Sequence, residues 1–357
     1  MKKIKQIIKI LSFSLILGIL LFVLSCMAKP VLSTGSDHYN IGGLYCEKEN
    51  SLDVVYVGGS AVCVYYAPLQ AWEKYGIVSY DYAANTVQLE LYQTMIKELL
   101  KTQKPELIIL DARALQYRDK DNVDAQPPSE VSYRNTLTEM KLSRNKMDFI
   151  NTYVEKVTGE SKASFYFDLI KFHDNLTKPR SGYLEIMFGK YKNPYNGFLL
   201  VPSYTLIGQR DFSTSVKKPV SGETEAILND LLDYMDETGI DYLFTVSPYA
   251  EKKEHKMTFN YVQEIIENRG YRFIDCNEYV DQMELDFETD LYDNNHVNIY
   301  GAEKYTDFLS QYILTNYEIP NRKEDPDYVF MNTYLDEWHL DVKSTKAIID
   351  QIISEVS

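Results

Sequence analysis

The chain has 357 residues, of which 45% are hydrophobic and 25% charged, a composition typical of folded globular proteins. Its formal net charge is −15, and Lys2, Lys3, Lys5 and Lys9 precede an apolar N-terminal run, so the rest of the chain carries four more negative charges, −19. This acidic body argues against nucleic acid as a partner, because phosphate contacts need clustered lysines and arginines. The 30 tyrosines suit carbohydrate contact, although packing of half-buried surfaces explains most of them equally well.

The apolar N-terminal run spans residues 8–24 and lies at the short end of the roughly 17–25 residues that a membrane-spanning helix needs. The lysines before it favour an orientation with the N-terminus inside the cell. We therefore expect a cytoplasmic tail over residues 1–7, a transmembrane signal-anchor over 8–28 and a linker over 29–50. The expected location is the cell membrane, with a single pass and an extracellular domain.

Two other interpretations of the N-terminus stay open. One is a cleavable signal peptide, which we favour less because no Ala-x-Ala cleavage site follows the apolar run. The other is lipidation of Cys26, since residues 23–26 faintly resemble a lipobox. All three interpretations place the body of the protein outside the cytoplasm.

The cysteines are Cys26, Cys46, Cys63 and Cys276, and they form no CxxC pair and no zinc spacing. Cys63 and Cys276 lie in apolar stretches, where a buried small side chain is the better interpretation than a ligand. A disulfide through Cys46 stays possible in an oxidising compartment. We predict no metal site and no cofactor.

Short apolar runs alternate with amphipathic segments through the body. Continuous hydrophobicity over a few residues predicts strands that are buried on both faces of a parallel sheet. Such runs occur at residues 53–59, 77–84, 107–110, 241–248 and 271–276. Helical spacing occurs at residues 87–101, 223–237, 258–268 and 301–317. The alternation predicts an α/β domain over residues 51–317, a three-layer α/β/α sandwich with a mostly parallel five-stranded sheet and right-handed crossovers.

The third and fourth predicted strands are about 130 residues apart, far more than one crossover requires. We therefore expect an insertion over about residues 116–221, with a helical stretch at 146–157 and a loop at 193–198 that cover the substrate. The tail over residues 318–357 is expected to be a C-terminal appendage with a short amphipathic helix near 344–356.

The first predicted strand ends at Gly58-Gly59-Ser60. In parallel α/β sheets, sites form at the carboxyl ends of the strands. A serine between a strand and a helix has an exposed hydroxyl, and the helical N–H groups beside it stabilise an oxyanion. This signal is weak alone, because most glycine-serine turns are only turns.

The second candidate motif is Asp293-Asn294-Asn295-His296, just before the last predicted helix of the domain. Spacing i, i+3 in a turn places the Asp293 carboxylate beside Nδ1 of His296, which leaves Nε2 to take the proton of a serine. Alone, this motif is better explained as a turn followed by a helix cap. In combination with Ser60 it predicts a Ser60–His296–Asp293 catalytic triad.

This order of motifs resembles the SGNH/GDSL hydrolase family, in particular the cell-surface branch that includes teichoic-acid D-alanylation and alginate O-acetylation enzymes. The resemblance covers residues 52–317 without the insertion, and residues 290–301 are its most specific part. It implies an SGNH, flavodoxin-like fold and a serine esterase or acyltransferase with Ser60, Asp293 and His296 as catalytic residues. It further implies a cell-envelope polysaccharide or another acylated glycan as substrate.

The chain departs from the family pattern in two places. Gly59 stands where the family has the non-catalytic aspartate of Gly-Asp-Ser, and no Gly-x-Asn-Asp follows the third strand. Our candidates for the oxyanion and substrate-binding residues are Gly59, Asn85 and Arg113. For Arg113, a structural pairing with Asp111 is an equally good interpretation.

The missing Gly-x-Asn-Asp also supports a different class of function, a non-catalytic glycan-binding or scaffolding protein on a degenerate SGNH fold. Reaction with a fluorophosphonate probe separates the two, since only an activated serine reacts. A metal-dependent hydrolase is a remote third alternative.

Overall fold

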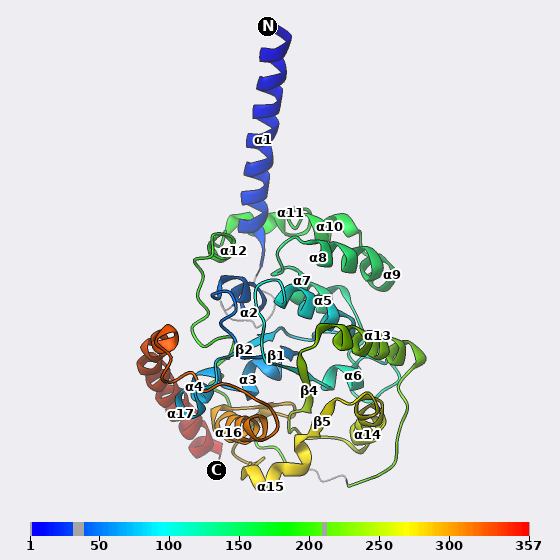
Figure 1. Cartoon of the computed structure of the whole chain (residues 1–357), viewed down its shortest axis with the longest axis vertical. Coiled ribbons are helices and arrows are strands. Elements are labelled where there is room, and N and C mark those ends of the chain that lie inside the picture. Colours follow the sequence, from blue (N-terminus) through cyan, green and yellow to red (C-terminus); the bar gives the residue numbers. More distant parts are fainter. Residues whose placement is uncertain (1, 31–38, 209–212, 357) are drawn as a thin grey trace.

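Five parallel strands form the centre of the fold in the computed structural model, which describes residues 2–30, 39–208 and 213–356 (Figure 1). The strands are β1 (Val54–Gly58), β2 (Ser79–Ala83), β3 (Leu107–Asp111), β4 (Asp241–Val246) and β5 (Arg272–Asp275). Their order across the sheet is β2-β1-β3-β4-β5. Every position of β1, β2 and β3 is buried, which explains the apolar sequences of β1 and β3, whereas β2 also buries Ser79 and Asp81. The prediction of an α/β protein with a five-stranded parallel sheet is confirmed.

The strand order reverses between β1 and β3, because the chain moves from β1 to β2 on one side and then returns to β3 on the other. In open parallel sheets, ligands bind at such a switch point, in the crevice beyond the carboxyl ends of the strands. The chain leaves β1 at Gly58 and β3 at Asp111. The residues that follow these two positions are therefore the first place to look for a site.

Four principal helices lie close to the predicted ranges: α5 (Leu89–Leu99), α13 (Gly222–Thr238), α14 (Lys253–Asn268) and α16 (Ile299–Asn316). Two further helices, α3 (Val62–Tyr65) and α4 (Pro68–Tyr75), lie between β1 and β2, where no helical range was predicted. Helix α5 packs against β1 and α13, whereas α3 contacts both β1 and β2 and packs against α16. In the tail, α17 (Leu335–Val356) begins nine residues before the predicted helix and packs against α4 and α16.

Several short helices connect β3 to β4. They are α6 (Arg113–Tyr117), α7 (Glu130–Leu137), α8 (Arg144–Phe149), α9 (Glu155–Thr158), α10 (Lys162–Tyr166), α11 (Leu169–Phe172) and α12 (Gly182–Met187). A π-helical turn at Ile150–Val154 joins α8 to α9 within the helical stretch expected at 146–157. The remaining elements are α2 (Asn40–Gly43), α15 (Val280–Met283), the pair β6 (Leu291–Asp293) and β7 (His296–Val297), and 3-10 turns at Leu44–Cys46, His173–Thr177, Cys276–Tyr279 and Pro326–Tyr334.

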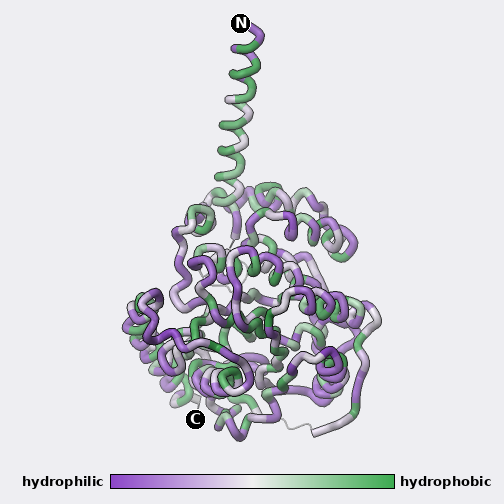
Figure 2. The backbone as a smooth tube through the Cα atoms, viewed as in Figure 1, coloured by the Kyte–Doolittle hydropathy of each residue, from purple (hydrophilic) through white to green (hydrophobic). Residues whose placement is uncertain are grey.

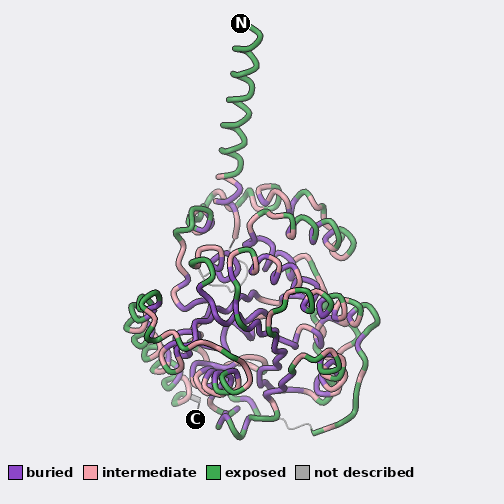
Figure 3. Tube along the Cα trace, viewed as in Figure 1, coloured by how far each residue is buried: buried purple, intermediate pink, exposed green. Residues whose placement is uncertain are grey.

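Helix α1 (Lys2–Ala28) projects from the body and is exposed along most of its length (Figures 1 and 3). Figure 2 shows it as mainly hydrophobic. Among the described residues, it is the one helix long and apolar enough to cross a membrane. Its last turn is buried, and α1 packs there against α11, α12 and the turn at His173–Thr177.

The segment expected as a linker packs into the body over residues 39–46, whereas its residues 31–38 lie outside the described chain. Ile41 and Leu44 are fully buried in the main core. The backbone N–H groups of Ile41 and Gly42 donate to the buried Glu139 carboxylate. Apolar burial and this carboxylate therefore hold residues 39–46 in the fold.

The loop at residues 193–198, expected to cover the substrate, instead covers the free edge of β2. The Asp81 N–H donates to the carbonyl oxygen of Asn196, and the Asn196 side chain donates to the Ser79 carbonyl. Gly197 has φ of +97°, and a Cβ there would overlap the Asp81 carbonyl, so only glycine fits. The physical reason for this placement is that an edge strand leaves backbone groups that need partners.

Asp81 itself is fully buried on β2, and neither of its carboxyl oxygens has a hydrogen-bond partner among the described residues. Burial raises the pKa of Asp81 well above its ordinary value. The folded chain therefore keeps a proton that the unfolded chain releases. The stability associated with this group is complete below the ordinary pKa and is lost as the pH rises toward the folded-state pKa.

We expect Asp81→Asn to raise the free energy of unfolding, with a gain that grows between about pH 5 and about pH 8, because an amide has no proton to release. Urea unfolding of the full chain in detergent at both pH values measures this. Asp121→Asn, at an exposed position, is the control and should change neither value appreciably. A gain that stays constant with pH would contradict the assignment.

Candidate active site

Ser60 lies in the turn between β1 and α3, at the switch point of the sheet. Gly58 is required before it, because a Cβ at that position would lie 2.5 Å from Cβ of Asp111 and 2.6 Å from a methyl group of Val62. The Val62 N–H donates to the Gly59 carbonyl and closes the turn. This turn places Ser60 at the partly exposed rim of the sheet.

Asp293 and His296 face each other across a tight hairpin. Asp293 ends β6, His296 begins β7, and the two residues are antiparallel partners around Asn294-Asn295. After β7, the side chain of Asn298 accepts from the N–H of Tyr300 and caps α16. The Asp-x-x-His spacing thus corresponds to a two-residue hairpin turn.

The three side chains of the predicted triad form one hydrogen-bonded chain. Ser60 Oγ lies 2.7 Å from Nε2 of His296. Nδ1 of His296 lies 2.9 Å and 3.0 Å from the two carboxylate oxygens of Asp293. The Asn295 N–H also donates to Asp293, at 2.7 Å. In this arrangement Asp293 fixes the tautomer of the imidazole and Nε2 is directed at the serine hydroxyl.

The electrostatics favour an ionised Asp293. Burial alone would raise the pKa of this carboxyl group. The hydrogen bond and charge of His296, together with the N–H groups of Asn295 and His296, outweigh burial and hold the pKa below its ordinary value. Beside it, the ring of Tyr292 stacks on the imidazole, with ring centroids 5.3 Å apart and planes 5° from parallel. The ring orientation of His296 is thus restrained on two sides.

Buried side chains hold the hairpin turn against the sheet. The Asn295 carbonyl oxygen accepts from Arg113, at 2.9 Å, and from the Tyr65 hydroxyl, at 3.1 Å. The adjacent Asn294 carbonyl accepts from the N–H of Ala250. These bonds come from segments after β1, β3 and β4, so they fix the turn relative to the sheet edge that carries Ser60.

Arg113 is 4% exposed, and its guanidinium lies 4.4 Å from the ring centre of Tyr249. Its link to Asp111 runs through the backbone, because the Arg113 N–H donates to the carboxylate. Among the described residues, the hydrogen-bond partners of the Arg113 guanidinium are Ser247, Asn295 and Tyr117 rather than the Asp111 carboxylate. Of the two interpretations of Arg113, the structural one thus takes a different form, in which the guanidinium supports the hairpin turn and also lines the cavity.

A cavity of about 60 Å³ opens beside Ser60 and His296. Gly59 and Arg113 also line it, as predicted. Asn85 is not among its lining residues, and its carbonyl accepts from the side chain of Asn135. Most of the remaining wall is formed by Thr86, Val87, Gln88, Asp111, Tyr117, Gln126 and Asn295. The structure therefore brings together every predicted site residue except Asn85.

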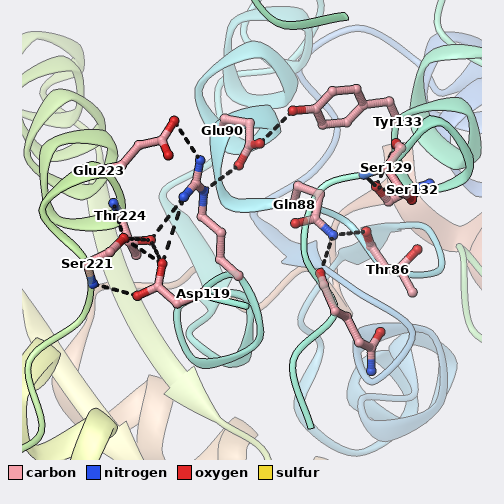
Figure 4. Close-up of polar contacts among 12 residues, drawn as sticks. Thr86, Gln88, Glu90, Asp119, Ser129, Ser132, Tyr133, Ser221, Glu223 and Thr224 are labelled. Carbon is pink, nitrogen blue, oxygen red and sulfur yellow. Dashed lines mark hydrogen bonds and ion pairs between the residues drawn. The ribbon is translucent and has the colours of Figure 1, made fainter. Parts of the chain in front are cut away.

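The wall opposite the triad is fixed by the amide of Gln88, which donates to the carbonyl oxygens of Thr86 and Gln126 (Figure 4). Thr86 has φ of +54°, a left-handed conformation that is rare for a β-branched residue. Backbone strain of this kind concentrates at functional sites. The side chain of Asn135, which donates to the Asn85 carbonyl and the Thr86 hydroxyl, holds the turn in this conformation.

A buried ion pair involves Glu90, two residues after Gln88 on the chain (Figure 4). The Arg118 guanidinium donates to Glu90, at 3.1 Å, and Tyr133 donates to the other oxygen of the same carboxylate. Arg118 also donates to Thr224 of α13. The network ties the first turn of α5 to the segments that follow β3.

Sequence reasoning missed Asn295 and Tyr292 as parts of the site. Both lie inside the stretch that carries the strongest motif, so adjacency to Asp293 and His296 is the signal that identifies them. Asn295 lines the cavity, and its side-chain oxygen accepts from the Tyr117 hydroxyl at 3.3 Å. Within the described residues, the side-chain nitrogen of Asn295 has no protein acceptor.

No protein-family model matches this chain, and no curated protein is significantly similar to it.

We expect Arg118→Met to lower the free energy of unfolding by about 3–5 kcal/mol, because it leaves the buried Glu90 carboxylate without its cation. Urea unfolding of the full chain in detergent measures the loss. Arg269→Met is the matched control, since Arg269 makes exposed ion pairs with Asp233 and Asp236 and should matter little. Equal losses in the two variants would show that the buried network contributes no more to the free energy of unfolding than an exposed ion pair does.

Proposed function

We propose that the protein is an extracytoplasmic serine enzyme that hydrolyses or transfers an acyl ester on a cell-envelope glycan. The observation that carries this proposal is the hydrogen-bonded chain from Ser60 through His296 to Asp293 at the rim of a cavity. A serine hydroxyl in contact with an oriented imidazole is the arrangement that turns a weak nucleophile into a reactive one.

The first half-reaction forms an acyl-enzyme. Nε2 of His296 takes the proton of Ser60 while Oγ attacks the ester carbonyl carbon, and the negative charge moves to the carbonyl oxygen. Collapse of this tetrahedral intermediate breaks the bond to the leaving alkoxide, which receives the proton from His296. Asp293 stays ionised and stabilises the imidazolium.

In the second half-reaction, water or a glycan hydroxyl gives its proton to His296 and attacks the acyl group on Ser60. The proton then returns to the Ser60 oxygen when the acyl bond to the enzyme breaks. Water gives an esterase and a glycan hydroxyl gives an O-acyltransferase. The cavity of about 60 Å³ favours a small acyl group such as acetyl.

The proposal places the chain in the SGNH/GDSL family, with a three-layer sandwich and an insertion over about residues 116–221. Contacts of α3 with α16 and of α5 with α13 support two separate helical layers about the sheet. The ends of the long connection meet, since the Ser221 hydroxyl donates to the Asp119 carboxylate at 2.6 Å. An insertion within a crossover connection must begin and end at nearby points, and the two ends of this segment do so.

One departure from the family pattern has a physical explanation in this site. A Cβ at Gly59 would lie 3.8 Å from Oδ2 of Asp111, so the side chain of an aspartate at position 59 would bring a second carboxylate to this buried carboxyl group. Burial already raises the pKa of Asp111, with Arg113 opposing it. Glycine avoids the repulsion between two carboxylates at the carboxyl ends of β1 and β3.

We assign the side-chain amide of Asn295 as an oxyanion donor beside the backbone N–H of Ser60. Its oxygen is held by Tyr117 and its backbone by Arg113, so the orientation of the amide is restrained before substrate binds. Preorganised donors of this type provide much of the stabilisation of a tetrahedral oxyanion. Asn295 would thus take the place of the family's missing asparagine after the third strand.

The proposed location rests on α1. The lysines at its start favour a cytoplasmic N-terminus, which places the body outside the cell. An acylated glycan of the cell envelope is the substrate class within reach of a domain in that position.

Labelling by a fluorophosphonate probe tests the nucleophile. We expect the full chain to be labelled, and Ser60→Ala and His296→Ala to abolish labelling, because only a serine in contact with a base reacts. Ser203→Ala, a partly buried serine away from the cavity, is the matched control and should label normally. Absence of labelling in the parent chain would instead favour a non-catalytic glycan-binding protein.

Acyl-ester turnover tests the oxyanion donor. We expect Asn295→Ala to lower kcat by about 10²–10³-fold, the usual effect of removing one such donor, while KM changes little. Asn294→Ala, the exposed neighbour on the same turn, controls for disturbance of the hairpin. If both variants lose activity equally, the turn matters and the Asn295 amide does not.

A further inference from the structure

The length of α1 leaves no spacer between a bilayer and the body. The exposed apolar side chains of α1 run from Ile4 to Phe22, which is about 28 Å at 1.5 Å per residue. The hydrocarbon core of a bilayer is about 30 Å thick. From Ser25 onward the helix is already buried in the body. A bilayer crossed by α1 therefore ends where the body begins.

The elements around the base of α1 expose large apolar side chains at this level. Leu142 and Met187 line one cavity together with Phe22 of α1, yet they are 64% and 40% exposed. Ile170 lies on α11, which packs against α1, and Phe188 directly follows α12, which also does; they are 53% and 74% exposed. Apolar side chains gathered around the exit of a hydrophobic helix match the headgroup and acyl boundary of a bilayer.

The charge of the same segment is opposite to that of the rest of the chain. Residues 141–192 contain ten lysines and arginines against six aspartates and glutamates, a net charge of +4, although the whole chain carries −15. Lys178 and Lys190 are exposed within it, and Lys171, also exposed, pairs with Glu130. Each basic residue near an anionic membrane surface contributes about 1 kcal/mol of attraction. The face is therefore complementary to anionic lipid headgroups.

We infer that α11, α12 and the residues that flank them form a docking surface that rests in the interface of an anionic phospholipid bilayer. Leu142, Ile170, Met187 and Phe188 enter the headgroup and acyl boundary, and the lysines of the surface contact the lipid phosphates. This inference rests on the proposed membrane anchor and is independent of the chemistry at Ser60.

The docking surface has a consequence for the candidate active site. Because the last turn of α1 is buried in the body and the surface around it contacts lipid, the body has one orientation relative to the bilayer. The cavity at Ser60 then lies at a constant height above the membrane. Glycans that remain attached to the membrane, or lie next to it, are the acceptors that such a geometry selects.

Tryptophan quenching by brominated phospholipids tests the docking surface. The full chain is reconstituted into vesicles of phosphatidylcholine with phosphatidylglycerol, with Phe188→Trp as probe and Leu340→Trp as control. Leu340 is 68% exposed on α17, which lies away from α1 (Figure 1). Trp72 and Trp338 are buried and give a background that the parent chain measures.

We expect brominated lipid to remove roughly half of the emission added by Phe188→Trp, since an interfacial side chain lies about 5–10 Å into the headgroup boundary, and to leave that of Leu340→Trp unchanged. Quenching should weaken in phosphatidylcholine alone and in a Lys178→Glu, Lys190→Glu double variant. Equal quenching at the two positions would overturn the docking surface, and quenching that ignores phosphatidylglycerol would overturn its charge specificity. Fluorophosphonate labelling of the same samples reports on Ser60 separately, so either proposal can fail alone.

Discussion

The carbonyl oxygen of Asn295 is the point on which the candidate site depends. It accepts hydrogen bonds from Arg113 and Tyr65, two buried side chains that follow different strands of the sheet. Together with the bond from the Ala250 N–H to the Asn294 carbonyl, these bonds fix the hairpin of Asp293 and His296 to the edge that carries Ser60. The fixed hairpin holds the imidazole 2.7 Å from the serine hydroxyl.

Several ionisable side chains are buried in this fold, and their hydrogen bonds hold the segments around them in place. The buried Arg113 guanidinium is held by carbonyl, hydroxyl and aromatic partners, whereas Arg118 is neutralised by Glu90. Such groups cost desolvation free energy, and they tolerate few alternative arrangements because every alternative leaves a charge unpaired. Asp81 behaves differently, since its buried carboxyl group has no hydrogen-bond partner among the described residues and burial raises its pKa, so it keeps its proton.

The base of α1 joins the apolar N-terminal helix firmly to the body of the protein. Its last turn is packed among α11, α12 and the turn at His173–Thr177, so the helix and the body form one continuous structure. The apolar side chains of Leu142, Ile170, Met187 and Phe188 are exposed around it, and these are the side chains that we propose to contact the bilayer.

Much of the fold could be read from the sequence by itself. Mainly apolar runs located the five parallel strands, because strands buried on both faces need few polar residues, although β2 carries Ser79 and Asp81. Helical periodicity located α5, α13, α14 and α16. The Ser60 turn and the Asp293–His296 spacing could be recognised because each is a local pattern. Only the tertiary structure decided the rest. The roles of Arg113, Asn295 and the loop at 193–198 depend on which segments meet at a sheet edge, and such long-range contacts leave no periodic trace in the sequence.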